Sequence, residues 1–189
     1  GEQLFEEMEL GGTVNFIAFR QAVAGYNRIK EKSKPILTLI DFSKPSTEKR
    51  FFVFDMEKKK LLYSSVVAHG RNSGENYATS FSNQYGSYKS SLGFYLTENT
   101  YQGGNGYSLI LNGLEKGIND KAKARSIVVH GAPYANPSVA ASGRLGRSLG
   151  CPALPTKLAR PIINTIKDGS VMFIYANNPH YLAQSNILH

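Results

Sequence analysis

The feature that most constrains the fold is a series of seven short apolar or alternating runs between Ile36 and Ala176. Gly, Asn and Ser separate these runs, which is the punctuation typical of strands joined by turns. The runs cover residues 36–42, 50–56, 61–69, 92–98, 107–111, 126–130 and 171–176. The pattern predicts a mainly β fold, either an antiparallel β-sandwich or a partly closed barrel.

Two further segments have helical spacing. Apolar residues recur at three- and four-residue steps over residues 13–32, which predicts an amphipathic helix with Thr13 as its N-cap. We expect residues 1–34 to form a helical extension packed on a main domain of residues 35–189. A second helix is expected over residues 156–167, where Asp168-Gly169 would end it.

The charge pattern limits the classes of partner. The formal net charge is +8, from 22 Lys and Arg against 14 Asp and Glu, which favours contact with polyanions. The basic residues are scattered, and the tight run Lys58 to Lys60 follows acidic residues as in a solvated turn. Because no helix carries a basic stripe interleaved with aromatics, nucleic acid is not an expected partner. No window reaches the ~20 apolar residues of a membrane span, so we expect no membrane insertion of this chain.

Cys151 is the single cysteine of the chain. This count excludes intramolecular disulfides and zinc sites of the Cys-x-x-Cys kind. A lone thiol is either inert packing or a reactive group. Its neighbours, which include Gly150, Pro152 and Arg147, are not those of a core strand, and they leave both interpretations open.

Two predicted strands end in a histidine followed by glycine, at His69-Gly70 and His130-Gly131. A histidine at a strand end is partly exposed and held by rigid backbone, as a general base needs to be. Each is followed by an unusually long polar loop, over residues 71–91 and 131–149, and such loops tend to carry function.

The second loop is long enough to return Cys151 to the strand end where His130 lies. The sequence therefore permits a Cys/His pair within hydrogen-bond reach, in which the imidazole raises the thiolate fraction. Gly150 fits this hypothesis, because a residue without a side chain lets backbone N–H groups approach a developing oxyanion.

Two competing sites are weaker. Residues 146–150 match the Gly-x-Ser-x-Gly pattern around Ser148, with Asp168 and His180 downstream in the order of α/β-hydrolases. A nucleophile elbow should follow a strand and open a helix, and the flanking residues are typical of neither. For a metal, His69 and His130 are the only conceivable pair, and the chain has no His-x-x-His spacing, so no metal site is expected.

His130-Gly131, a loop, and then Ser148-Leu149-Gly150-Cys151 resemble the signature of the L,D-transpeptidase catalytic domain (YkuD-like) family, which is His-Gly, a loop and Ser-x-Gly-Cys. The similarity extends to the murein L,D-transpeptidase branch and covers roughly residues 36–176. The segments that carry it are residues 69–71, 81–83, 91–93, 125–130 and 146–153.

The resemblance implies a β-sandwich-like enzyme whose cysteine attacks an L,D peptide bond in the peptidoglycan stem peptide, with release of terminal D-alanine. An amine acceptor would make the protein an L,D-transpeptidase, and water would make it an L,D-carboxypeptidase. A non-catalytic wall-binding module is the alternative of a different class. The implied roles are Cys151 as nucleophile, His130 as general base and acid, and the backbone N–H groups of Gly150 and Cys151 as oxyanion hole.

The chain departs from the commoner family motif at Leu149, where the family has His, and at Ala153, where it has Arg or Asn. Substrate binding is therefore assigned to a different set, and a bidentate guanidinium suits the stem carboxylate. These residues are Arg147, Ser148, His69, Arg71 and Gly131. No cofactor is expected, and the expected partners are peptidoglycan stem peptides. Because that substrate lies outside the cytoplasmic membrane, the resemblance implies an exported protein of the periplasm or cell envelope, with a signal segment that the printed sequence does not contain.

Overall fold

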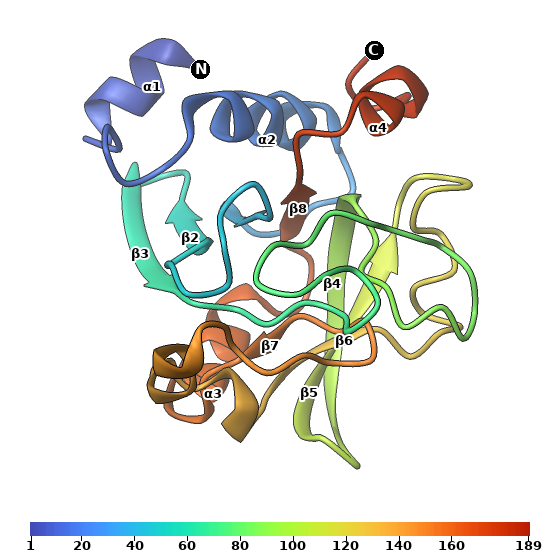
Figure 1. The fold of residues 1–189 in the computed structure, drawn as a ribbon. Helices are drawn as coiled ribbons and strands as arrows, with labels where there is room; N and C mark the ends of the chain where they lie inside the picture. The colour runs from blue at the N-terminus through green and yellow to red at the C-terminus, as the bar shows by residue number, and fades with distance from the viewer.

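The computed structural model describes residues 1–189 and is built around one eight-stranded sheet that curls into a nearly closed barrel (Figure 1). The strand order is β3-β2-β1-β8-β4-β5-β6-β7. The strands are β1 (Ile36–Asp41), β2 (Phe51–Asp55), β3 (Lys60–Ser65), β4 (Gly93–Gly103), β5 (Gly106–Gly113), β6 (Val128–Gly131), β7 (Ala153–Leu154) and β8 (Val171–Tyr175). The α-helices are α1 (Glu2–Glu7), α2 (Phe16–Arg28), α3 (Thr156–Ile166) and α4 (Pro179–Gln184).

The two edges of the sheet approach each other beyond β3. Ala68 forms an antiparallel bridge with Ala153 of β7, and Gly70 forms a parallel bridge with Ser148. These bridges bring the last strand of the sheet back to the chain that leaves the first. They also place the His69-Gly70 segment beside the chain that enters Cys151.

The predicted fold class is confirmed, since the chain is mainly β with a helix before the sheet and a helix after the cysteine. All seven predicted runs form strands. The sheet is mixed rather than wholly antiparallel, because β8 pairs in parallel with β1 and β7 pairs in parallel with β6. Parallel neighbours need a crossover connection, and the loop between residues 131 and 153 provides one for β6 and β7.

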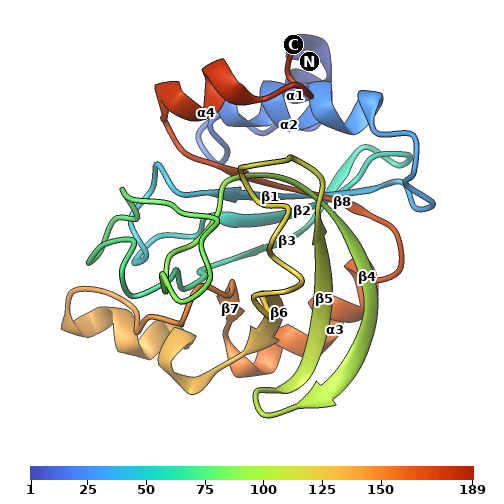
Figure 2. The same ribbon diagram turned by 90° about the vertical axis from the view of Figure 1, so that its right-hand side faces the viewer.

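The first long helix begins later than the sequence predicts. The Asn15 side chain accepts hydrogen bonds from the N–H groups of Ile17 and Ala18, at 2.9 and 3.3 Å. Asn15 is therefore the N-cap of α2, and the prediction of Thr13 as the cap was wrong. The short helices α1 and α4, at the ends of the chain, were not predicted. In Figure 2, α1, α2 and α4 cover one side of the sheet and α3 lies on the other.

A hydrophobic core of 42 buried residues joins both layers. Phe94 of β4 and Phe173 of β8 stack with their ring centroids 4.2 Å apart. α2 packs closely over them at Gly25, where an added Cβ would lie 2.1 Å from the Phe94 ring. Full burial of each such side chain is worth about 2 kcal/mol. None of the helices has the length and apolar content needed to cross a bilayer.

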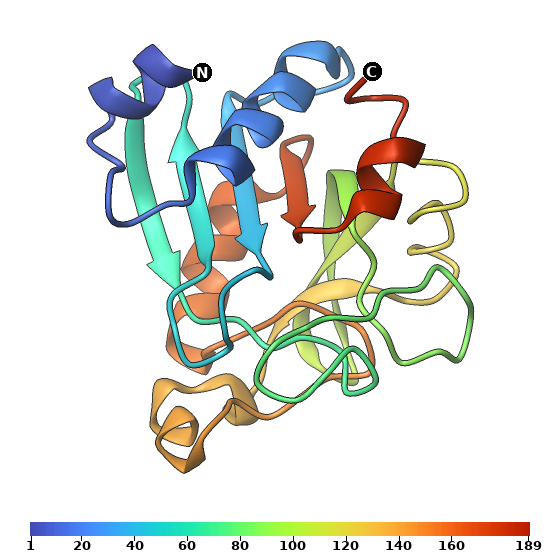
Figure 3. The ribbon, with the colours of Figure 1, turned by 45° about the horizontal axis from the view of Figure 1, so that its top comes forward.

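The two long loops meet at one end of the barrel. Residues 71–91 form no helix or strand, whereas the loop after β6 contains two short 3-10 helices, η1 (Pro133–Ala135) and η2 (Pro137–Ser142). In Figure 3 the chain after β3 and the chain leading into β7 run side by side below the sheet. A backbone hydrogen bond from Arg71 N to Ser148 O, at 2.8 Å, ties them together.

Candidate active site

Cys151 lies in a tight turn formed by residues 148–151, the cysteine turn. The Ser148 hydroxyl holds this turn, since it donates to Cys151 O at 2.6 Å and accepts the Gly150 N–H at 3.0 Å. Gly150 has a φ of +127°, and an added Cβ would lie 2.9 Å from Ile127 Cδ1 and 3.0 Å from Lys89 O. The Ser-Leu-Gly-Cys sequence therefore needs its glycine both for conformation and for space.

Cys151 is a buried residue, 7% exposed, and backbone groups hold its thiol. The Val128 N–H donates to Sγ at 3.4 Å, and the thiol donates to Ser126 O at 3.5 Å. Burial raises the pKa of the thiol, while the Val128 N–H and the positive charge of Arg125 act in the opposite direction. The resting group is a protonated thiol at neutral pH.

The β6/β7 register brings His130 close to the segment that carries Cys151. β6 and β7 pair in parallel with His130 opposite Ala153, two residues after Cys151. The sulfur accepts a hydrogen bond from the backbone N–H of Val128, two residues before His130 on β6. The structure contains no direct hydrogen bond between the thiol and the imidazole.

The hydrogen bond of His130 defines its tautomer. Its Nδ1 lies 2.9 Å from Gly131 O, and since a carbonyl oxygen only accepts, Nδ1 carries the hydrogen. Nε2 then keeps its lone pair. Burial lowers the pKa of His130, and the bond to Gly131 partly opposes this. At neutral pH the ring is in the form that accepts a proton.

The two backbone N–H groups predicted to form the oxyanion hole differ in whether they already have an acceptor. The Gly150 N–H is taken up by the Ser148 hydroxyl at 3.0 Å. The Cys151 N–H has no acceptor in the protein.

His69 lies in the wall of the site, not on its surface. It is 1% exposed, accepts a hydrogen bond at Nδ1 from the Arg50 guanidinium at 2.8 Å and donates from Nε2 to Gly74 O at 3.1 Å. Burial, with a smaller contribution from Arg50, lowers the pKa of His69 to about 4. These two bonds leave neither ring nitrogen free for a ligand.

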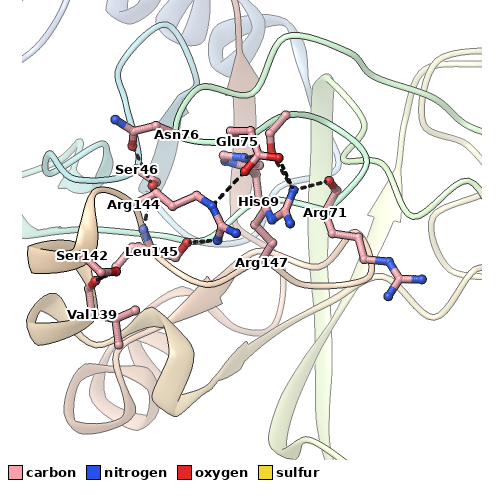
Figure 4. Close-up of polar contacts among 11 residues, drawn as sticks. Ser46, His69, Arg71, Glu75, Asn76, Val139, Ser142, Arg144, Leu145 and Arg147 are labelled. Atoms are coloured by element: carbon pink, nitrogen blue, oxygen red, sulfur yellow. Dashed lines mark hydrogen bonds and ion pairs between the residues drawn. The ribbon is translucent and has the colours of Figure 1, made fainter.

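Arg147 and Arg71 lie side by side where the two loops meet (Figure 4). Arg147 Nη1 donates to Arg71 O at 2.9 Å and to Gly74 O at 3.3 Å, and it lies 3.4 Å from the Glu75 carboxylate. Glu75 also pairs with Arg144, at 3.0 Å. The Arg71 guanidinium extends away from this cluster and lies over the Tyr88 ring, 4.6 Å from its centroid. Among Arg71, Arg144 and Arg147, Arg71 is therefore the exposed arginine that has no carboxylate partner.

Sequence reasoning missed two residues near the thiol. Tyr134 packs on a small alanine cluster that includes Ala153, and burial together with the charge of Cys151 raises the pKa of Tyr134 to about 12. Arg125 makes four hydrogen bonds beside the cysteine turn. Arg125 lies in residues 125–130, one of the segments that carry the family resemblance, so the resemblance could have pointed to it. Nothing in the sequence pointed to Tyr134.

A groove of about 280 Å³ reaches the residues that hold the thiol. Two of its lining residues, Ser126 and Val128, are the hydrogen-bond partners of Cys151 Sγ. The complete lining is Tyr101, Ile110, Lys123, Ser126, Ile127 and Val128.

The competing sites find no support in the geometry. Ser148 follows a loop and precedes β7, so the strand–turn–helix of a nucleophile elbow is not formed there. Its hydroxyl is also used within the cysteine turn. No group of three or more His, Cys, Asp or Glu side chains is placed to hold a metal ion.

The fold and the site define a mainly β, nearly closed barrel that presents a cysteine turn next to a strand-end histidine. The sequence profile of the L,D-transpeptidase catalytic domain family matches residues 11–175. The chain belongs to this family of cysteine L,D-transpeptidases. No protein of curated function matches the sequence.

Solved L,D-transpeptidase structures are similar to the chain at low identity. The enzyme from Mycobacterium smegmatis is 15% identical, over 75% of this chain and 59% of that chain, with a TM-score of 0.47. L,D-transpeptidase 3 from Mycobacterium tuberculosis is 14% identical, over 75% and 61%, with a TM-score of 0.48. The protein from Stackebrandtia nassauensis is 12% identical, over 94% and 77%, with a TM-score of 0.45. The chain thus spans about 59% of the length of the first of these relatives.

Proposed function

We propose that this chain is a peptidoglycan L,D-transpeptidase that forms a thioester on Cys151 from a stem tetrapeptide and transfers the acyl group to an amine acceptor. The observation that carries the proposal is the β6/β7 register, which pairs His130 with Ala153, together with the hydrogen bond from the β6 backbone at Val128 to the Cys151 sulfur. Membership of the family supports the substrate class.

The first half of the reaction uses a neutral thiol and a neutral imidazole. The Cys151 proton passes to Nε2 of His130 as the sulfur attacks the carbonyl carbon of the L,D peptide bond. The C–N bond then breaks, and His130 returns the proton to the departing D-alanine amine. The thioester remains on Cys151.

In the second half an acceptor amine attacks the thioester and loses a proton to His130. The C–S bond breaks, the new peptide bond is a cross-link, and the thiol regains its proton from His130. The Cys151 N–H is the proposed donor to the oxyanion of both tetrahedral intermediates, because it has no competing acceptor within the protein. The Gly150 N–H would have to leave Ser148 to join it.

The groove beside Ser126 and Val128 is the proposed binding place for the stem peptide, because it reaches the backbone that holds the thiol. Arg71 is the proposed partner of a stem carboxylate, with Arg147 fixing the backbone from which it extends. With peptidoglycan as the proposed partner, the proposed location is the periplasm or cell envelope.

The test is product analysis by mass spectrometry after the chain is incubated with tetrapeptide muropeptides. New stem-to-stem dimers are expected, and they should disappear in Cys151→Ala and fall by at least about 10²-fold in His130→Ala. His180→Ala, which changes an exposed histidine of α4, is the matched control. Tripeptide plus free D-alanine without dimers would identify a carboxypeptidase instead. Products that persist in Cys151→Ala would refute the proposed nucleophile.

A further inference from the structure

Arg125 holds one long polar segment beside the cysteine turn. Its Nη1 donates to Ser82 O at 3.0 Å and to Ser91 Oγ at 2.7 Å. Its Nη2 donates to Ser87 Oγ at 3.1 Å and to Lys89 O at 2.8 Å. All four acceptors belong to residues 82–91, here called the clamp segment, which has no helix or strand to hold it.

The clamp segment packs directly against the cysteine turn. An added Cβ at Gly150 would lie 3.0 Å from Lys89 O and 3.5 Å from Arg125 Nη2. An added Cβ at Gly70 would lie 2.7 Å from Tyr88 O and 3.0 Å from Gly150 Cα. The clamp segment is therefore close enough to cover the turn that carries Cys151, a residue that is 7% exposed.

The same guanidinium is the positive charge near the thiol. Arg125 lowers the pKa of Cys151, and Cys151 raises that of Arg125, which agrees with the contact at Gly150. The other titratable groups of this region are Tyr134, whose pKa the charge of Cys151 raises, and His130 on the neighbouring strand β6. His130 is neutral in the resting site, so it supplies no positive charge before proton transfer.

We propose that Arg125 is a positioning residue that holds the clamp segment against the cysteine turn and thereby keeps its own charge beside the Cys151 thiolate. This inference deepens the proposed function, on which it rests. A guanidinium suits both tasks, because its planar fork serves several acceptors at once and its charge is permanent. The proposal predicts that acidity and accessibility of the thiol depend on one side chain through two separable effects.

The test is the rate of Cys151 alkylation by iodoacetamide, measured from pH 6 to pH 10 with intact-mass detection. The midpoint of the pH profile reports the acidity of the thiol, and the plateau at high pH reports its accessibility. Arg125→Gln removes both the charge and the fork, whereas Arg125→Lys keeps the charge and removes the fork. We expect the midpoint of Arg125→Gln to lie about one pH unit above that of Arg125→Lys. Both plateaus should rise above that of the wild type.

Two further variants separate the effects. Ser87→Ala removes one acceptor of Arg125 without a change in charge, so its plateau should rise and its midpoint should not. Lys121→Gln removes an exposed charge from the same turn and should change neither. Circular dichroism and the thermal midpoint confirm that each variant is folded.

Equal midpoints in Arg125→Gln and Arg125→Lys would overturn the proposal, as would plateaus identical to that of the wild type. A purely structural Arg125 would lower the thermal midpoint of both variants without separating their alkylation midpoints. Failure of the proposed function is distinguishable, because it appears as missing muropeptide products and does not alter these alkylation profiles.

Discussion

The buried pair of His69 and Arg50 should make the fold sensitive to acid. His69 has a folded pKa of about 4 against 6.5 in the unfolded chain, because burial and the neighbouring Arg50 and Arg147 cations disfavour its charged form. A depressed histidine pKa stabilises the fold above pH 6.5, and this stabilisation is lost as the pH falls from 6.5 toward 4. The full effect is about 3 kcal/mol, of which about 2 kcal/mol is lost between pH 7 and pH 5.

The perturbation is His69→Gln, because a glutamine amide stays neutral at every pH and offers both an acceptor and a donor to the same neighbours. The assay is urea unfolding at pH 7 and pH 5, with the free energy of unfolding taken at each pH. We expect the wild type to lose about 2 kcal/mol more than His69→Gln between the two values. His180→Gln, at an exposed position of α4, is the control and should lose as much as the wild type.

The reasoning would be refuted by parallel losses in the wild type and His69→Gln. That result would mean that His69 does not bind its extra proton on unfolding, so the buried contact with Arg50 would be absent in solution. A lower overall stability of His69→Gln at both pH values would not affect the test, since the comparison uses only the difference between them.

Two further predictions concern packing. Ser148→Ala removes the two hydrogen bonds that hold the turn at Cys151. The free energy of unfolding should therefore fall by about 1–3 kcal/mol, and product formation should slow. Unchanged turnover would contradict this prediction. Gly25→Ala places a methyl group against the Phe94 ring and should lower the stability measured by thermal unfolding by about 1–3 kcal/mol. The control Gly11→Ala, whose added methyl group meets nothing within 4 Å, should keep the stability of the wild type. Equal stabilities of the two variants would mean that α2 lies farther from the sheet.

The sequence predicted the strands well because their pattern is local. Each of the seven runs carries its own apolar alternation and turn residues, and each forms a strand. β7 escaped prediction because it has only two residues and owes its pairing to partners far away in the chain, including His130. Its parallel pairing with β6, and that of β8 with β1, join segments far apart in the chain, which no local pattern encodes.

The candidate site was predicted in part. Cys151 and His130 were found because each has distinctive neighbours, the Ser-Leu-Gly-Cys turn and the strand-end His-Gly. The surroundings of His69 could not be predicted from the sequence. His69 has the same His-Gly pattern as His130, but its ring is buried against Arg50, which is 19 residues away in the sequence. Arg125 was missed for a similar reason, since its four acceptors lie 34–43 residues earlier in the chain.

The most direct test of the central claim is intact-mass spectrometry of the native protein mixed with a tetrapeptide stem substrate and quenched in acid. We predict a mass increase equal to the substrate minus D-alanine, located on Cys151, in the wild type. It should be absent from Cys151→Ala and form much more slowly in His130→Ala. A wild-type protein that never acquires this adduct while it forms product, or an adduct on another residue, would contradict acyl transfer through Cys151.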